Sequence, residues 1–148
     1  MQQTIHNNAG NKLKNKRMKK LITIIVLTLT INCFSQTQGE MNTDASNAYK
    51  KVDMELNNVY QKVLTEYKSD LTFINRLKKA QRIWISYRDA ELEMKFPAEN
   101  KQYEYGSIYP MCVSYFLKGL TEERTEKLRV WLTGIQEGDA CSGSVKMK

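Results

Sequence analysis

Apolar residues recur at three- and four-residue steps through residues 77–92, which read LKKAQRIWISYRDAEL. On a helix these positions share one face and form a stripe that is partly aromatic and partly polar, made of Leu77, Ala80, Gln81, Trp84, Tyr87, Arg88 and Leu92. No strand-like alternation is present, so the pattern predicts a helix in a small bundle. We expect this helix to begin near Leu71 and to end at or before Phe96, because Pro97 disfavours helical geometry at the preceding residue.

A similar stripe in the preceding segment predicts a first long helix. Its inward positions are Tyr49, Val52, Leu56, Tyr60, Val63 and Tyr67. Thr43 or Asp44 can cap its start, and Ser69 with Asp70 supplies a turn to the next helix. Two long helices joined by so short a turn are expected to lie antiparallel.

The last third of the chain predicts a polar loop and two further helices. Residues 98–107 form the loop, and residues 108–118 form a short helix that ends at Gly119. Thr121 caps a last helix, which ends at Gly138 and whose inward positions are Leu128, Trp131, Leu132 and Ile135. The predicted fold class is all-α: a small antiparallel helical bundle of three long helical segments and one short helix.

The formal charge of +7 is concentrated in the first 35 residues. These hold six of the 23 lysines and arginines and no acidic residue, so the remaining chain carries 17 basic and 16 acidic residues. A near-neutral domain is not expected to bind nucleic acid, and we interpret the patch of Lys78, Lys79 and Arg82 as solubilising.

Residues 18–35 are interpreted as a secretory signal peptide. A basic start at Met18 leads into an apolar run, and small side chains precede a cleavage site at Gln36. The run is short for a stable membrane span, so the predicted mature chain is periplasmic or secreted and has no span.

Cleavage of a signal peptide would define two further segments, and two alternatives to this cleavage stay open. Residues 1–17 become an upstream extension, and residues 36–43 become a polar linker. Cys33 could instead be lipidated, although Asn32 stands where a lipoprotein signal has Gly or Ala. The other alternative is that the apolar run stays as a membrane anchor.

In an oxidising compartment the mature chain would hold two cysteines, Cys112 and Cys141, so one disulfide between them is expected. Closing a loop of about 30 residues contributes about 3 to 4 kcal/mol in the chain-entropy model. The disulfide would tie down the C-terminal tail, residues 139–148, and residues 44–138 would form the helical domain.

Candidate catalytic chemistry is sparse. The single histidine, His6, lies in the upstream extension, so the mature chain lacks the commonest general base and a frequent zinc ligand. Acid pairs one helical turn apart, Asp89 with Glu93 and Glu122 with Glu126, could form a hydrolase site, but such acids are usually solvated side chains. We expect no enzyme activity, no cofactor and no metal.

Two groups of residues suggest specific contacts. Arg88 lies inside the apolar stripe. It could form local ion pairs with Asp89 and Glu91, which contribute little at a surface, or it could point inward to Asn57 or a carboxylate such as Asp53 and so fix the register of the first two helices. A candidate protein-contact surface in the loop around Gly106 consists of Tyr103, Tyr105, Ser107 and Tyr109. The alternative for these tyrosines is packing onto the end of the bundle.

Four short motifs follow one another in an order that resembles a known family. The pattern LN..Y stands at Leu56, Asn57 and Tyr60. The pattern L..AQ..WI.YRDA runs from Leu77 to Ala90 and includes Gln81, Trp84, Tyr87, Arg88 and Asp89. GS stands at Gly106 and Ser107, and LT..R...L runs from Leu120 to Leu128 through Thr121 and Arg124. The series resembles the exported family named after the lysozyme inhibitor LprI and covers about residues 53–132.

The resemblance implies a small α-helical exported protein with a protein partner and, for the named member, inhibition of lysozyme. Many members carry a cysteine after the YRDA block and another before the LT motif, whereas Cys112 and Cys141 stand here instead, which suggests a relocated disulfide. An inhibitor would insert residues 98–109 into the substrate cleft of lysozyme. The alternative is a structural or accessory envelope protein that holds another protein on the bundle surface.

Overall fold

The computed structural model describes residues 37–147. The chain divides into two compact units, Met1–Glu40 and Met41–Lys148. Residues 37–40 are the described part of the first unit, and they are helical. The predicted upstream extension, the signal peptide of residues 18–35 and Cys33 lie outside the described residues.

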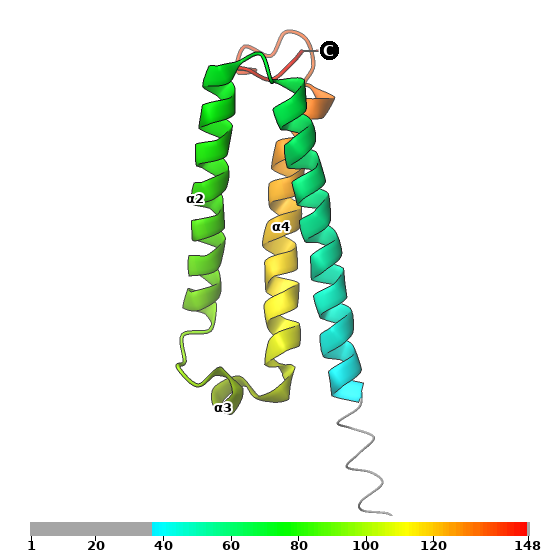
Figure 1. Ribbon diagram of the computed structural model, residues 1–148, viewed down its shortest axis with the longest axis vertical. Coiled ribbons are helices and arrows are strands. Elements are labelled where there is room, and N and C mark those ends of the chain that lie inside the picture. Colours follow the sequence, from blue (N-terminus) through cyan, green and yellow to red (C-terminus); the bar gives the residue numbers. More distant parts are fainter. Residues whose placement is uncertain (1–36, 148) are drawn as a thin grey trace, which may run out of the picture. The chain divides into compact units, whose positions relative to one another are not determined.

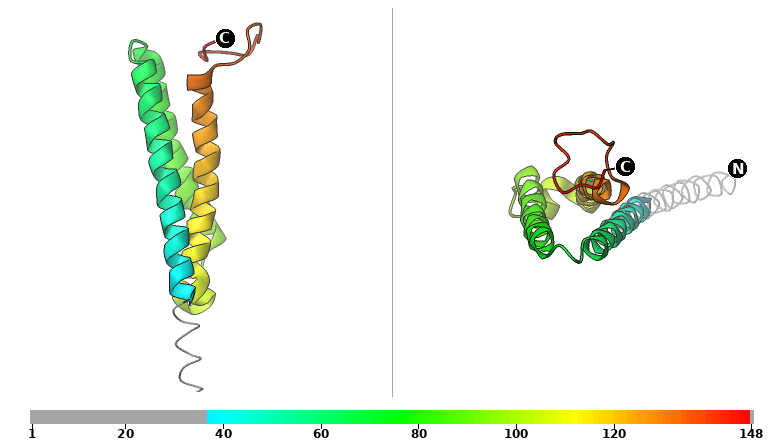
Figure 2. Two further views of the ribbon diagram at one scale, coloured as in Figure 1. Left: turned by 90° about the vertical axis from the view of Figure 1, so that its right-hand side faces the viewer. Right: turned by 90° about the horizontal axis from the view of Figure 1, so that it is seen from above.

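The second unit consists of helices and a C-terminal segment. Its elements are a helix over residues 41–66, here called the N-terminal helix, followed by α2 (Leu71–Lys95), α3 (Lys101–Tyr105), the 3-10 helix η1 (Gly106–Ile108) and α4 (Tyr109–Thr133). Within this unit the three long helices run side by side, and α2 is antiparallel to the other two (Figure 1). The view from above shows that they do not lie in one layer (Figure 2). The predicted all-α bundle is confirmed.

Residues 37–43 are helical, so the predicted linker over residues 36–43 and the start at Thr43 or Asp44 are wrong. A capping residue favours a helix start by only about 1 kcal/mol, and the single glycine in this stretch costs a similar amount. Ala45, one turn later, is buried. The predicted stripe of this helix is confirmed, since Leu56, Val63 and Tyr67 are buried.

Both ends of α2 lie where the sequence predicts them. The Asp70 carboxylate caps its start by accepting a hydrogen bond from the Phe73 amide at 2.9 Å. The helix ends at Lys95, and Phe96 is the C-cap residue directly before Pro97. Phe96 is itself buried, so the chain stays packed against the end of the bundle where it leaves α2.

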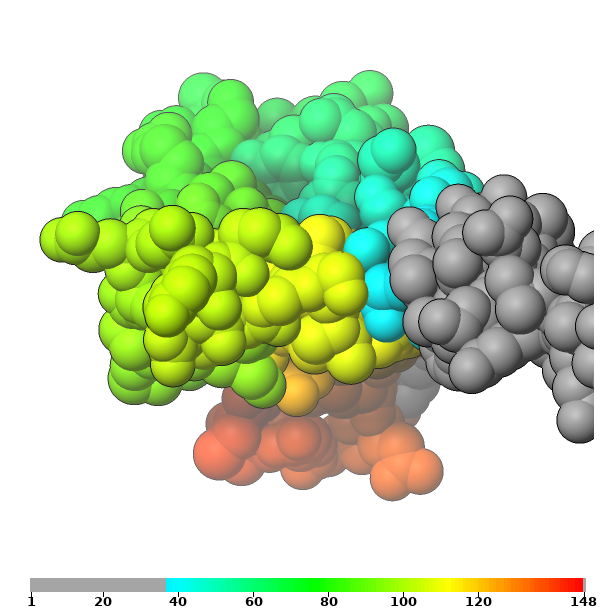
Figure 3. Space-filling model, turned by 90° about the horizontal axis from the view of Figure 1, so that it is seen from below, coloured from blue at the N-terminus to red at the C-terminus, as the bar shows by residue number. Residues whose placement is uncertain are grey.

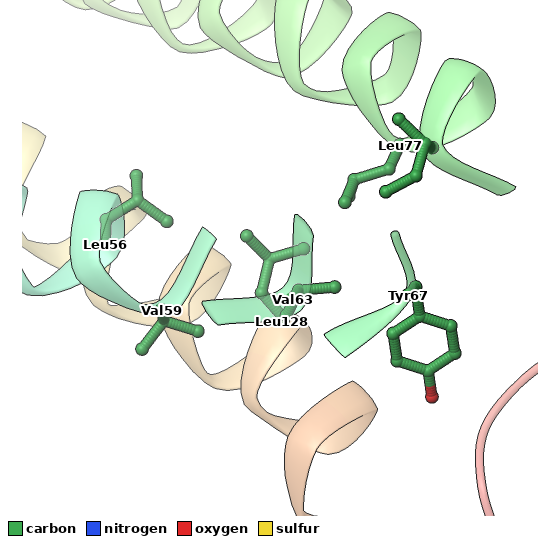
Figure 4. Packing of buried hydrophobic residues seen from close by; sticks show 7 residues of the cluster. Leu56, Val59, Val63, Tyr67, Leu77 and Leu128 are labelled. Carbon is green, nitrogen blue, oxygen red and sulfur yellow. The ribbon is translucent and has the colours of Figure 1, made fainter. Parts of the chain in front are cut away.

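The core lies mainly along the N-terminal helix. Figure 4 shows its buried side chains meeting Leu77 of α2 and Leu128 of α4. At the end near the first turn, an aromatic cluster extends this core: the ring centroids of Tyr67 and Phe73 lie 4.5 Å apart, and those of Phe73 and Trp131 lie 4.9 Å apart. The Tyr67 hydroxyl donates to the Trp131 carbonyl at 3.1 Å, so its burial leaves this polar group satisfied.

Gly119 lies inside α4 and does not end a helix, so the two predicted helices on either side of it are one. Glycine costs about 1 kcal/mol in a helix interior. Buried positions continue across it, from Ser114 on one side to Thr121, Thr125 and Leu128 on the other. Packing on both sides therefore outweighs the local preference to break. The one short helix, α3, instead lies in the segment that the sequence predicts as a loop.

The continuous α4 also explains why the predicted disulfide between Cys112 and Cys141 is wrong. Both cysteines are free. Cys112 lies in the first turns of α4, whereas Cys141 follows its far end. At 1.5 Å per residue, the helix between Cys112 and Thr133 is about 30 Å long, and a disulfide needs Cα atoms within about 7 Å.

Other contacts hold the C-terminal segment. The Lys146 ammonium forms an ion pair with Glu66 and lies 5.4 Å from the ring centroid of Tyr67. The Ile135 amide donates to the Lys146 carbonyl at 3.0 Å. Charge therefore holds the tail at the end of the N-terminal helix, and a backbone hydrogen bond joins it to Ile135, just after α4. Neither contact involves Cys141.

Candidate functional site

The candidate protein-contact surface is built on a short segment between α2 and α4. Asn100 caps α3, because its side chain accepts a hydrogen bond from the Tyr103 amide at 3.0 Å. Lys101 reaches back and donates to the Phe96 carbonyl. The Lys101 contact thus ties the segment to the end of α2, and the Asn100 cap orders the first turn of α3, so the segment is an ordered platform instead of a free loop.

Two of the four predicted contact residues, Tyr105 and Tyr109, pack onto the bundle end. Their rings stack with centroids 5.6 Å apart, and each meets the buried Phe96 ring edge-on at 5.2 Å. The Tyr105 hydroxyl accepts a hydrogen bond from the Ala98 amide at 3.2 Å. These rings therefore form an aromatic cap that supports the segment, which is the alternative role that the sequence left open for them.

The other two residues, Tyr103 and Ser107, face solvent. Tyr103 is 86% exposed, and Ser107 is exposed while its carbonyl accepts a hydrogen bond from Asn42 at 3.0 Å. Between them Gly106 has a φ of 67°, a left-handed conformation that glycine adopts without the cost of a side chain. This turn separates Tyr103 on α3 from Ser107 on η1. Figure 3 shows the segment covering much of this end of the unit.

The segment around this exposed pair carries two acidic side chains and one basic one. Glu99 and Glu104 are exposed, whereas Lys101 is partly buried and its ammonium group, which keeps its charge, donates to the Phe96 carbonyl. The surface therefore presents a large aromatic side chain, a small polar one and two free carboxylates. Exposed tyrosine held on a rigid backbone gives large contact area at a low cost in conformational entropy.

A second cluster joins the motif residues in the middle of the bundle. Two guanidinium groups lie over the Trp84 ring, with Arg88 at 5.4 Å and Arg124 at 5.8 Å from its centroid. Arg124 on α4 also donates to the Gln81 side-chain oxygen on α2 at 3.0 Å. Burial lowers the pKa of the Arg124 guanidinium, and Tyr60 partly opposes this effect. These residues connect the three long helices to one another.

Arg88 reaches the N-terminal helix through a different residue from the one predicted. Its guanidinium donates to the Asp89 carboxylate at 2.7 Å and to the Tyr49 hydroxyl at 3.4 Å. Asn57 instead bonds to Asp53, one turn before it on its own helix. The predicted contact of Arg88 with Asn57 or Asp53 is therefore wrong. Its inward direction is confirmed, because only 16% of the Arg88 side chain is exposed.

The remaining motif residues divide between surface and core. Asn57, Tyr87 and Asp89 are exposed, and the charge of Glu91 raises the pKa of the Tyr87 hydroxyl. Thr121 was predicted to cap a helix, but it lies inside α4 and is fully buried. Its hydroxyl has no hydrogen-bond partner within the described part of the chain.

Sequence reasoning missed two residues that position the candidate surface. Phe96 was considered only as the end of a helix, yet it is the ring on which Tyr105 and Tyr109 pack. Asn42 was placed in a linker, yet it donates to the Ser107 carbonyl. The aromatic residues that follow Phe96 as far as Tyr109 could have indicated the role of Phe96. No local pattern indicated the second, because it joins residues 65 positions apart.

No helix of residues 37–147 is both long and apolar enough to cross a membrane. In the same range, no group of three or more histidine, cysteine, aspartate or glutamate side chains is arranged to hold a metal ion.

Comparisons with known proteins agree with the motif pattern. A family model described as lysozyme inhibitor LprI matches residues 33–128, which confirms the resemblance noted from the sequence. The chain is 35% identical over 105 residues to the uncharacterized protein R02472 of Rhizobium meliloti (strain 1021), and the match covers 63% of this chain and 72% of that protein. No solved structure matches.

Proposed function

Because the chain belongs to the lysozyme inhibitor LprI family, we propose that it is an exported protein that binds lysozyme and blocks it without catalysis. The proposed contact surface is the solvent-facing part of α3 and η1, centred on Tyr103 and Ser107. Export would depend on the signal peptide of residues 18–35. The mass of the protein released by expressing cells tests this part of the proposal, since retention of Met1 would contradict it.

The exposure of Tyr103 is the observation that carries the proposal. A tyrosine with 86% of its surface exposed does not contribute to the core, while the segment beneath it is held by the aromatic cap. Interface residues that dominate binding are often tyrosines, and a pre-formed backbone lowers the entropy lost on binding. The exposed Glu99 and Glu104 suit a basic partner, and lysozymes of the animal type are basic.

Occlusion is the mechanism that this geometry favours. Lysozyme cleaves its substrate with two carboxyl groups in a cleft. Tyr103 projects from the end of the bundle, whereas Tyr105 and Tyr109 keep its base in place. A projecting aromatic ring that enters the cleft would exclude the polysaccharide without any chemistry by the inhibitor.

The test is a titration of the protein into a lysozyme assay that follows the clearing of cell walls. Wild-type protein should inhibit in proportion to its dose, and Tyr103→Ala should weaken inhibition about tenfold or more. Tyr115→Ala is the matched control, because Tyr115 is an exposed tyrosine on α4 that belongs neither to the candidate surface nor to α2. Thermal unfolding of both variants should match wild type.

Three results would refute parts of this proposal. No inhibition by a large molar excess of folded protein would leave the accessory envelope role as the better account. Equal loss in Tyr103→Ala and Tyr115→Ala would mean that inhibition does not depend specifically on Tyr103 of α3. Clearing of cell walls by the pure protein without lysozyme would mean that the chain is an enzyme.

A further inference from the structure

A second stripe of apolar side chains lies on a face of α2 that the bundle leaves uncovered. Its members, here called the outer stripe, follow at alternating three- and four-residue steps: Ala80, Ile83, Tyr87, Ala90 and Met94. All five are exposed, and the exposed fractions of the largest are 58% for Ile83, 53% for Tyr87 and 68% for Met94. This alternation is the spacing with which two helices pack along each other.

The outer stripe is separate from the residues that hold α2 in its own bundle. Ile74 and Leu77 are buried in the core, and Trp84 packs against it. Single exposed apolar residues are ordinary on a protein surface. Five at helix-packing intervals form a continuous surface, and such surfaces mark contacts with other molecules.

Two pockets lie between α2 and α4, and one of them borders the outer stripe at Ala80. A pocket of about 430 Å³ is lined by Ala80 of α2 and by Arg124 and Leu128 of α4. Another of about 560 Å³, near the other end of α2, is lined by Lys95 and by Leu120 of α4. Open space therefore adjoins the outer stripe at its Ala80 end.

The charges of α2 are divided between its two halves. Residues 71–82 carry Arg76, Lys78, Lys79 and Arg82 and no acid. All three acids of the helix, Asp89, Glu91 and Glu93, lie in its second half, which also holds Arg88 and Lys95 and so has a net charge of −1. Lys79 and Glu93 are 14 positions apart, which is close to four helical turns, so both flank the outer stripe on the same side.

We propose that the outer stripe binds a second copy of this chain, with the two α2 helices antiparallel about a two-fold axis near Tyr87. In this arrangement Ala80 of each copy lies beside Met94 of the other, and Ile83 beside Ala90, so that large side chains meet small ones. The basic half of each helix faces the acidic half of its partner, and Lys79 pairs with Glu93 of the second copy. The contact is self-complementary, as a two-fold interface requires. This inference is independent of lysozyme binding.

Light scattering and analytical ultracentrifugation of the protein, recovered from cells that express the full chain, test this proposal across a range of concentrations. Wild type should form dimers as concentration rises. Ile83→Gln should abolish them, because it removes the branched side chain at the middle of the outer stripe. Lys79→Glu and Glu93→Lys should each weaken the dimer by roughly tenfold, since each replaces two attractive pairs with repulsive ones.

The double variant Lys79→Glu with Glu93→Lys is the decisive measurement, because it restores both pairs with their signs exchanged. It should return the dimer affinity to near that of wild type. Lys62→Glu is the matched control, because it reverses an exposed charge on the N-terminal helix. It should leave the dimer affinity unchanged. Circular dichroism of each variant verifies the fold.

Several outcomes would overturn the antiparallel dimer. One is a wild-type chain that stays monomeric at millimolar concentration. Another is a dimer whose affinity does not change in the single charge-reversal variants. Parallel helices would give this result, because position 79 of one copy would face position 79 of the other in wild type and variant alike. Loss of lysozyme inhibition in Ile83→Gln without any change in association would assign the outer stripe to lysozyme instead.

Discussion

Replacing Thr121 with valine should stabilise the protein, although threonine is one of the motif residues. Thr121 is fully buried in α4, and its hydroxyl has no partner in the described residues. A buried polar group without a hydrogen bond loses its contact with water and gains nothing in return. Valine has nearly the same shape, so it can fill the site without the polar group.

The size of the effect follows from this environment. Leaving a hydroxyl unsatisfied costs about 1 to 3 kcal/mol, and burying a methyl group in its place contributes up to about 0.8 kcal/mol more. Threonine and valine have similar helix propensities, so the helix itself should not respond. We expect the free energy of unfolding of Thr121→Val to rise by about 1 to 2 kcal/mol, and its melting temperature by roughly 4 to 8 °C.

Urea unfolding followed by circular dichroism measures this change, and the chain provides its own control. Thr125 lies one turn further along the same buried face, and its hydroxyl donates to the Thr121 carbonyl at 2.8 Å. Thr125→Val removes a hydroxyl that has a hydrogen-bond partner, so the free energy of unfolding should stay unchanged or fall by up to about 1 kcal/mol. If both variants behave alike, or if Thr121→Val is less stable than wild type, the Thr121 hydroxyl is not unpaired and the reasoning fails.

Two further predictions concern α4 and the tail. Gly119→Ala should raise the free energy of unfolding by about 0.5 to 1 kcal/mol in the same urea assay, because nothing lies within 4 Å of the added Cβ, and a loss would contradict this. Lys146 lowers the pKa of Glu66 below its ordinary 4.5, so the tail contact is kept above that pH and lost as the pH falls through the lowered value. An NMR acid titration should show the Ile135 amide shifting in this range, and Glu66→Gln should remove that transition.

The sequence was sufficient for features that depend on neighbours along the chain. The stripe ending at Tyr67, the turn at Ser69 and Asp70 and the stop before Pro97 are local, and all three agree with the structure. Gly119 shows the limit of such reasoning. Its preference to break a helix is real but small, and only the packing of Thr121 and Leu128 beyond it decides the outcome.

The candidate surface failed to follow from sequence for a related reason. Tyr103, Tyr105 and Tyr109 look alike in a polar segment, yet one is exposed and two are packed. The difference comes from Phe96, which the stop at Pro97 places under the segment. The predicted disulfide failed because the distance between two cysteines depends on every helix between them, and one continuous helix keeps Cys112 and Cys141 apart.

The positions of the motif residues suggest how one bundle can serve different partners. Contacts among four of these residues hold the helices together: Gln81, Trp84, Arg88 and Arg124. Substitutions at these positions would loosen the bundle and would affect binding of a partner only indirectly. Tyr103 lies outside these motifs, on a segment attached at its two ends. A change there alters the exposed surface and leaves the packing intact. The motifs therefore identify the fold, and the segment between α2 and α4 is where specificity for a partner can vary, with Gly106 keeping its turn.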